Sequence, residues 1–166
     1  MTQLQNGCSV KWQPLTVGLV YPFPRALVIA ILRAMSQQNV EAVRRVYERW
    51  ATGDFTASMG LLDPAAVLVL APEFPDAGTY EGLGRISEYM RGFLEPWTRV
   101  TIAAEELTDA GDAVLAAVRQ TAVGESSGLE TGLRYFQLWT FRDGKVVRLE
   151  GFRDRGAALA AAREAS

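Results

Sequence analysis

The stretch that decides the fold is residues 130–153, ETGLRYFQLWTFRDGKVVRLEGFR. Its centre, Asp143-Gly144, is a pair typical of a two-residue hairpin turn. Apolar and polar residues alternate on both sides of this pair, which is the period of a half-buried strand. The pattern therefore predicts two long antiparallel strands, over about 130–142 and 145–153.

One face of the first of these strands gathers an amide and three aromatic side chains, because side chains alternate along a strand. They are Tyr135, Gln137, Trp139 and Phe141. Across an unbroken hairpin, Gln137 is expected to face Glu150. If this face is concave, Gln137 can orient a polar group of a ligand while the aromatic side chains stack on it. The alternative is that it packs on a helix or on a partner subunit, and a β-bulge would invert the alternation.

Upstream of this hairpin, further elements follow from periodicity. A wide apolar stripe recurs at helical spacing between Ile86 and Trp97, whereas Val100, Ile102 and Ala104 alternate with period two. The predicted helices cover about 37–52, 54–62 and 83–95, and the predicted strands about 66–71, 100–105 and 113–123. Segregated helices and an antiparallel sheet predict an α+β fold, with a cone-shaped, strongly curved sheet wrapped around a long helix and two further N-terminal helices.

Composition excludes several classes of chemistry. The chain of 166 residues has a formal net charge of -2, no histidine and a single cysteine, Cys8. The absence of histidine excludes Ser-His-Asp catalysis and histidine-bearing metal sites, and one cysteine makes no internal disulfide. No metal-ligand spacing or cofactor-binding fingerprint is present. We therefore expect a cytoplasmic protein with no metal, no organic cofactor, and neither nucleic acid nor membrane as a partner.

The chain divides into three parts. Residues 1–34 are predicted to be a peripheral or disordered extension, with a poorly recognised export signal or a partner-binding arm as the alternative. Their apolar piece is far shorter than the roughly 20 residues that span a bilayer. Residues 35–155 are predicted to form one compact domain, and the Ala-rich residues 156–166 a tail or short helix.

A loop that carries two carboxylates joins the strand at 66–71 to the third helix. Glu73 lies at the end of that strand and Asp76 lies three residues further on. A carboxyl group at the mouth of an apolar pocket can have a raised pKa and transfer protons. The alternatives are a solvated loop carboxylate for Glu73 and a turn cap for Asp76.

Three segments, in this order, resemble the nuclear transport factor two-like superfamily, in its SnoaL-like and ketosteroid isomerase-like branch. They are Val46–Phe55, with its Gly-Asp ending, Gly78–Ile86, at the entry to the third helix, and Trp139–Val147, at the last hairpin. The resemblance covers about residues 36–155 and implies a cystatin-like α+β barrel. It does not specify the chemistry, because that superfamily hosts isomerases, cyclases, dehydratases, hydrolases and simple binding proteins.

The resemblance also implies roles for particular residues. In ketosteroid isomerases the proton-shuttling carboxylate lies nine positions before the glycine that opens the third helix, which corresponds to Glu73. The oxyanion-binding acid corresponds to Gln137, an amide, which is a departure from the pattern. The oxyanion tyrosine falls at Val46, with Tyr47 one position off and pointing about 100° away. The isomerase pair is thus expected to be absent, and steroid isomerisation is not expected.

Two kinds of function remain. The first is a cofactor-independent acid/base enzyme of isomerase, cyclase or dehydratase type acting on an apolar carbonyl-containing metabolite, with Glu73 moving a proton and Gln137 holding an oxyanion. The second is a ligand-binding protein or an interaction module of the same fold, and a homodimer fits all of these. The expected pocket residues are Trp50, Met90, Phe93, Trp97, Tyr135, Trp139 and Glu150.

Overall fold

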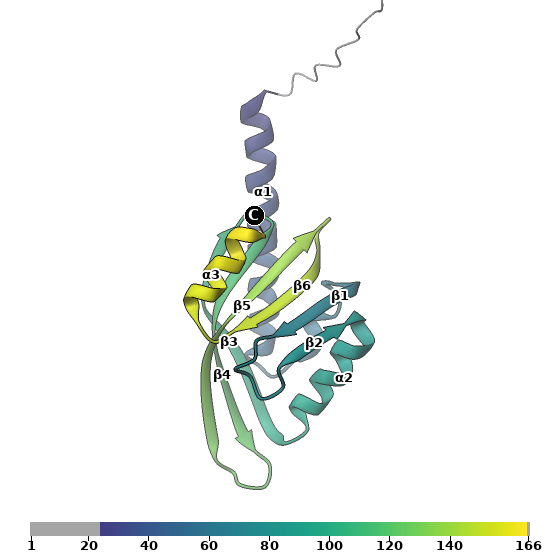
Figure 1. Cartoon of the computed structure of the whole chain (residues 1–166), viewed down its shortest axis with the longest axis vertical. Coiled ribbons are helices and arrows are strands. Elements are labelled where there is room, and N and C mark those ends of the chain that lie inside the picture. Colours follow the sequence, from purple (N-terminus) through teal and green to yellow (C-terminus); the bar gives the residue numbers. More distant parts are fainter. Residues whose placement is uncertain (1–23, 166) are drawn as a thin grey trace, which may run out of the picture.

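The computed structural model of the protein describes residues 24–165 (Figure 1). The helices are α1 (Arg25–Trp50), α2 (Gly82–Leu94) and α3 (Arg155–Glu164), and a short 3-10 helix, η1 (Phe55–Ser58), follows α1. The strands are β1 (Leu62–Leu70), β2 (Gly78–Glu81), β3 (Trp97–Ala110), β4 (Ala113–Gly124), β5 (Glu130–Arg142) and β6 (Lys145–Phe152). The four strands predicted at the end of the chain are confirmed, whereas β2 was not predicted.

All six strands form one sheet in the order β2-β1-β6-β5-β4-β3. The β1–β6 pair is parallel, and the other neighbouring pairs are antiparallel. Within residues 24–165 no pairing joins β2 to β3, so the sheet does not close into a complete barrel. The predicted α+β class with a mostly antiparallel sheet is confirmed.

Different helices cover the two faces of the sheet (Figure 1). Helix α1 packs on β3 and β4, and α3 packs on β4, β5 and β6. Alternation along β4 separates the two cores, because Val114 and Ala116 belong to the large core with α1, whereas Leu115 packs with Ala158 and Ala162 of α3. The short helix after Arg155 is capped by Asp154, whose carboxylate accepts a hydrogen bond from the Ala157 amide at 2.8 Å.

Helix α1 starts earlier than predicted. No proline or glycine interrupts residues 25–36, and Ser36, directly before the predicted start, donates a hydrogen bond to the Arg33 carbonyl inside the helix. The predicted boundary at residue 35 therefore falls within α1, while residues 1–23 of the predicted extension lie outside the described residues. The apolar side chains between Leu27 and Met35 are exposed, and the buried face of α1 begins at Val43. No helix within residues 24–165 is long and apolar enough to cross a membrane.

The helix that follows α1 is shorter than the sequence predicts, and the first strand, β1, begins earlier. Only Phe55–Ser58 is helical, and Asp54 caps it by accepting a hydrogen bond from the Thr56 amide. Asp63-Pro64, which precedes the predicted strand at 66–71 and is a pair typical of turns, lies inside β1, where the register shifts between Leu62 and Val67. The strand accommodates this proline because the pairing is interrupted there.

The predicted register of the last hairpin is wrong by one residue. Gln137 pairs with Gly151, and Glu150 pairs with Leu138. The cause is an irregularity in the pairing, because the neighbours Thr140 and Phe141 of β5 pair with Arg148 and Val146, which leaves one extra residue on β6. A bulge of this kind adds one residue to a strand and turns all the residues beyond it to the opposite face.

Candidate functional site

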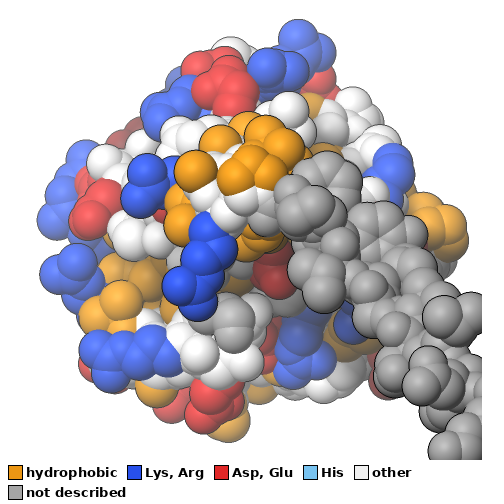
Figure 2. Space-filling view, turned by 90° about the horizontal axis from the view of Figure 1, so that it is seen from above, with side chains coloured by type: hydrophobic (Ala, Val, Ile, Leu, Met, Phe, Trp, Pro, Cys, Tyr) orange, Lys and Arg blue, Asp and Glu red, His pale blue; other side chains and the backbone are white. Residues whose placement is uncertain are grey.

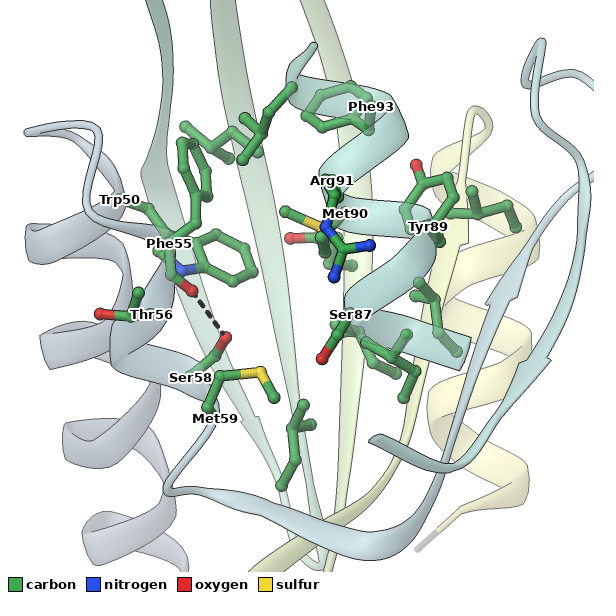
Figure 3. A pocket seen from close by; sticks show the side chains of 18 of the residues that line it. Trp50, Phe55, Thr56, Ser58, Met59, Ser87, Tyr89, Met90, Arg91 and Phe93 are labelled. Carbon is green, nitrogen blue, oxygen red and sulfur yellow. Dashed lines mark hydrogen bonds between the residues drawn. The ribbon is translucent and has the colours of Figure 1, made fainter. Parts of the chain in front are cut away.

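An apolar cavity of about 390 Å³ lies between α2, the end of α1, η1 and the inner face of the sheet (Figure 3). Met90 of α2 and Met59, directly after η1, project into it from opposite sides (Figure 3). The strands contribute aliphatic side chains such as Leu68, Ile102 and Leu149. A cavity of this size, mostly apolar and with few polar groups, is typical of a small-molecule site.

The cavity brings together five of the residues predicted for the site. They are Trp50, Met90, Phe93, Tyr135 and Gln137. Four other predicted residues do not line it: Glu73, Trp97, Trp139 and Glu150. These placements show which side chains border the cavity. The roles assigned to the residues stay predictions.

Gln137 and Ser58 are the buried polar residues among those that line this cavity, and a chain of hydrogen bonds orients Gln137. The Trp139 indole Nε1 donates to the Tyr47 hydroxyl at 2.9 Å, and that hydroxyl donates to Gln137 Oε1 at 2.6 Å. An indole N–H only donates, so the Trp139 contact leaves the single proton of the Tyr47 hydroxyl available for the amide oxygen of Gln137. The Gln137 NH₂ group makes no hydrogen bond within the described chain and is left to donate to a ligand.

The Tyr47 hydroxyl is a supporting group in this arrangement. Tyr47 is buried between α1 and the sheet, and its ring contacts those of Trp50 and Trp139 edge-on. Burial raises its pKa well above the ordinary range, and the Trp139 hydrogen bond offsets only part of that shift. The hydroxyl therefore stays protonated and keeps Gln137 in place. The sequence placed Tyr47 one position from the oxyanion tyrosine of the isomerases and pointing about 100° away, whereas its hydroxyl in fact contacts Gln137.

A second tyrosine–glutamine pair lines the same cavity. The Tyr135 hydroxyl lies 3.3 Å from Gln120 Oε1, to which it donates, and both residues border the cavity. Burial raises the pKa of Tyr135, so it too stays neutral. A third polar group is the Trp50 indole Nε1, which is buried and has no hydrogen-bond partner in the described chain. The cavity thus offers donors and no carboxylate.

Glu73 lies away from the cavity, in the exposed turn after β1. The next residue, Phe74, points inward instead, and its ring meets that of Tyr135 edge-on with centroids 5.5 Å apart. A tight turn explains why Phe74 rather than Glu73 faces the cavity. The Phe74 amide donates a hydrogen bond back to the Ala71 carbonyl at 3.0 Å. Proton transfer by Glu73 stays a prediction, and the placement of its side chain gives it no support.

Glu150 is directed to the other face of β6 by the bulge described above. Its carboxylate accepts a hydrogen bond from Arg148 at 2.9 Å. Leu149 takes the inward position that the predicted register gives to Glu150. Of the two indoles outside the cavity, Trp139 is fully buried behind Gln137, whereas Trp97 begins β3 and is partly buried.

Sequence reasoning missed several residues that line the cavity. Phe55 and Met59 belong to the segment that was predicted as a regular helix, and Gln120 lies on β4. Ser87 and Arg91 come from α2, where polar residues are expected to face solvent. The sequence did contain one signal for them. Ser87 and Arg91 are four residues apart, so they share one side of the helix, and each directly follows a residue of the apolar stripe, Ile86 or Met90.

Within residues 24–165 no cluster of three or more Cys, Asp or Glu side chains is arranged to hold a metal ion. A more polar hollow of about 530 Å³ lies on the far side of Tyr89 and Phe93, bordered by Asp76 and Arg85 among others. Its neighbour Tyr89 has a pKa raised mainly by burial, so this hydroxyl also stays neutral.

An open, mostly antiparallel sheet with a helix across an apolar cavity defines the class as an α+β protein with a site for a small molecule. The profile of the SnoaL-like domain family matches residues 43–149, more than half of the chain, so the protein belongs to this family. The resemblance identified from the sequence is thereby confirmed.

Solved structures agree with this assignment. A nuclear transport factor two-like protein from Burkholderia thailandensis is 29% identical, with a TM-score of 0.62, covering 74% of this chain and 95% of that chain. TerC, co-crystallised with polyporic acid, is 23% identical with a TM-score of 0.61. The match covers 76% of this chain and 98% of TerC. A protein from Catenulispora acidiphila with a ketosteroid isomerase-like fold, in complex with trimethylamine, is 16% identical with a TM-score of 0.59, covering 72% and 90%. No curated protein matches the chain.

Proposed function

We propose that this protein binds an apolar small molecule with a carbonyl group, and that Gln137 donates a hydrogen bond to that carbonyl. The observation behind the proposal is the Trp139–Tyr47–Gln137 chain, which leaves amide N–H groups as donors in an apolar cavity. A donor in such surroundings contributes strongly when a ligand oxygen meets it, because it is left unpaired otherwise.

Binding, rather than proton transfer, is the function that the cavity supports best. An acid/base enzyme needs a group that exchanges a proton near neutral pH. Among the lining residues the titratable groups are Arg91, Tyr89 and Tyr135, and burial raises the pKa of both tyrosines. TerC, which has the same fold, was co-crystallised with a small molecule, polyporic acid. Homodimer assembly and a cytoplasmic location stay predictions.

Competition between two matched molecules tests the role of Gln137. Fluorenone and fluorene have the same ring system and differ by one carbonyl. Each displaces the fluorescent reporter N-phenyl-1-naphthylamine from an apolar site. In the wild type we expect fluorenone to bind about fivefold more tightly, the order of one neutral hydrogen bond. In Gln137→Met the two molecules should bind equally.

Three controls accompany this measurement. Gln38→Met makes the same change on the exposed side of α1 and should keep the preference for fluorenone. Met90→Trp fills the cavity with an indole and should block the reporter, whereas Met35→Trp, on the exposed part of α1, should not. Equal binding of both molecules to the wild type, or an unchanged preference in Gln137→Met, would refute the proposal. Mass spectrometry of the same mixtures shows whether the ketone is converted.

A further inference from the structure

Arg91 is a cation without a partner at the edge of the cavity. It lines the cavity from α2, yet its guanidinium makes no ion pair or hydrogen bond within the described chain. Two acids lie within one turn of it along α2. Glu88 pairs with Arg85 at 3.2 Å, and Glu95 makes no ion pair with any described residue. The charge of Arg91 is therefore available to a bound molecule.

Ser87 lies one turn before Arg91 and borders the same cavity. Figure 3 shows its hydroxyl and the Arg91 guanidinium on the side of α2 that faces the gap towards Met59. A hydroxyl and a guanidinium side by side present several donors to one oxygen-bearing group. No Asp or Glu lines the cavity, so no negative charge opposes an anion there.

The space beyond this pair is apolar. Leu68, Leu70 and Ile102 line it and are each at most 8% exposed. An inorganic anion would leave this apolar space unfilled, and a wholly neutral molecule would make no use of the guanidinium of the exposed Arg91 at the cavity edge. The occupant that satisfies both features has an apolar body and one ionised acidic group.

We infer that the natural ligand is an amphipathic acid, whose carboxylate or ionised enol or phenol binds Arg91 and Ser87 at the mouth while its apolar body fills the cavity. The inference rests on the proposed function, because it names the class of molecule that the same cavity accepts. Arg91 then selects apolar molecules that have an ionised acidic group, and Gln137 donates a hydrogen bond to the carbonyl further inside.

A pair of fluorescent probes with one skeleton tests this inference on the full chain. 8-Anilinonaphthalene-1-sulfonate has a permanent negative charge, and N-phenyl-1-naphthylamine is the same skeleton without it. We expect Arg91→Gln to weaken the sulfonate about tenfold, the order of a charge-assisted contact, and to change the neutral probe less than about twofold. Arg91→Lys, which keeps the charge, should retain most of the affinity for the sulfonate.

Arg163→Gln is the matched control, because it removes the same charge from an exposed position on another helix, α3, outside the cavity. It should leave both affinities unchanged. Added salt should weaken the sulfonate alone. Equal affinity of Arg91→Gln and wild type for the sulfonate, or equal weakening of both probes, overturns the inference while the proposed function stands. If neither probe binds the wild type, both the inference and the proposed function fail.

Discussion

At the scale of single residues, the hydrogen bonds around Tyr47 decide what the cavity offers a ligand. Without the hydroxyl, the Trp139 indole loses its acceptor and Gln137 loses the donor that orients its amide. All three side chains are at most 6% exposed, so water does not readily replace the missing oxygen. The same contact thus bears on stability and on ligand selection.

Tyr47→Phe should reduce the free energy of unfolding by about 1–3 kcal/mol, because two buried polar groups lose a partner. It should also weaken the preference for fluorenone, since the Gln137 amide is then free to turn over. Urea unfolding measures the first effect. Tyr135→Phe serves as the comparison, because its bond to Gln120 is longer, at 3.3 Å, and a smaller loss is expected. A Tyr47→Phe protein as stable as the wild type would contradict this account.

The sequence located Gln137 but not what surrounds it. The resemblance to ketosteroid isomerases singled it out, and strand alternation put it on the same face as Trp139. The place of Tyr47 depended on how α1 is rotated against the sheet, and the sequence alone does not specify that rotation. Arg91 was missed for a related reason, because an arginine between apolar positions of a helix is usually read as solvent-facing.

At the scale of elements, the presence of a strand or helix was easier to predict than its register and its end residues. Alternation and the Asp143-Gly144 turn identified β5 and β6, but the bulge in β6 moved Glu150 to the other face. Likewise, because of the tight turn after β1, Phe74 lines the cavity and Glu73, the predicted residue, does not. Both changes arise from a local irregularity of one residue, which hydrophobic periodicity does not record.

Helix α1 offers a prediction at this scale. Its first residues contribute nothing to the core, in which Val40 and Val43 are the first contacts from α1. A chain that begins at Met35 should therefore melt within a few degrees of the full chain, because about 1 kcal/mol shifts the melting temperature of a domain of this size by only a few degrees. A chain that begins at Tyr47, which lacks Val43 and Val46, should not fold.

Calorimetry of the two shortened chains and the full chain makes this comparison. A drop of more than about ten degrees for the chain that begins at Met35 would mean that residues 1–34 contribute to the fold. The result also bears on the predicted domain boundary, which falls inside α1 rather than at its start.

At the scale of the whole molecule, buried tyrosines make stability depend on alkaline pH. Burial raises the pKa of Tyr47, Tyr89 and Tyr135 above the ordinary value of 10.0. The unfolded chain therefore loses these protons as the pH passes about 10, while the folded chain keeps them. Because the unfolded state then binds fewer protons, stability is fully present below that pH and falls as the pH rises further.

Each of these tyrosines should lower the free energy of unfolding by up to about 1.4 kcal/mol for every pH unit above 10. Urea unfolding at several pH values between about 9 and about 11.5 measures this slope, and tyrosinate absorbance shows that ionisation accompanies unfolding. Tyr135→Phe removes one of the three groups, so its slope should be smaller than that of the wild type. Equal slopes for the two proteins would mean that Tyr135 ionises as readily in the folded chain as in the unfolded one, which is incompatible with its burial beside the cavity.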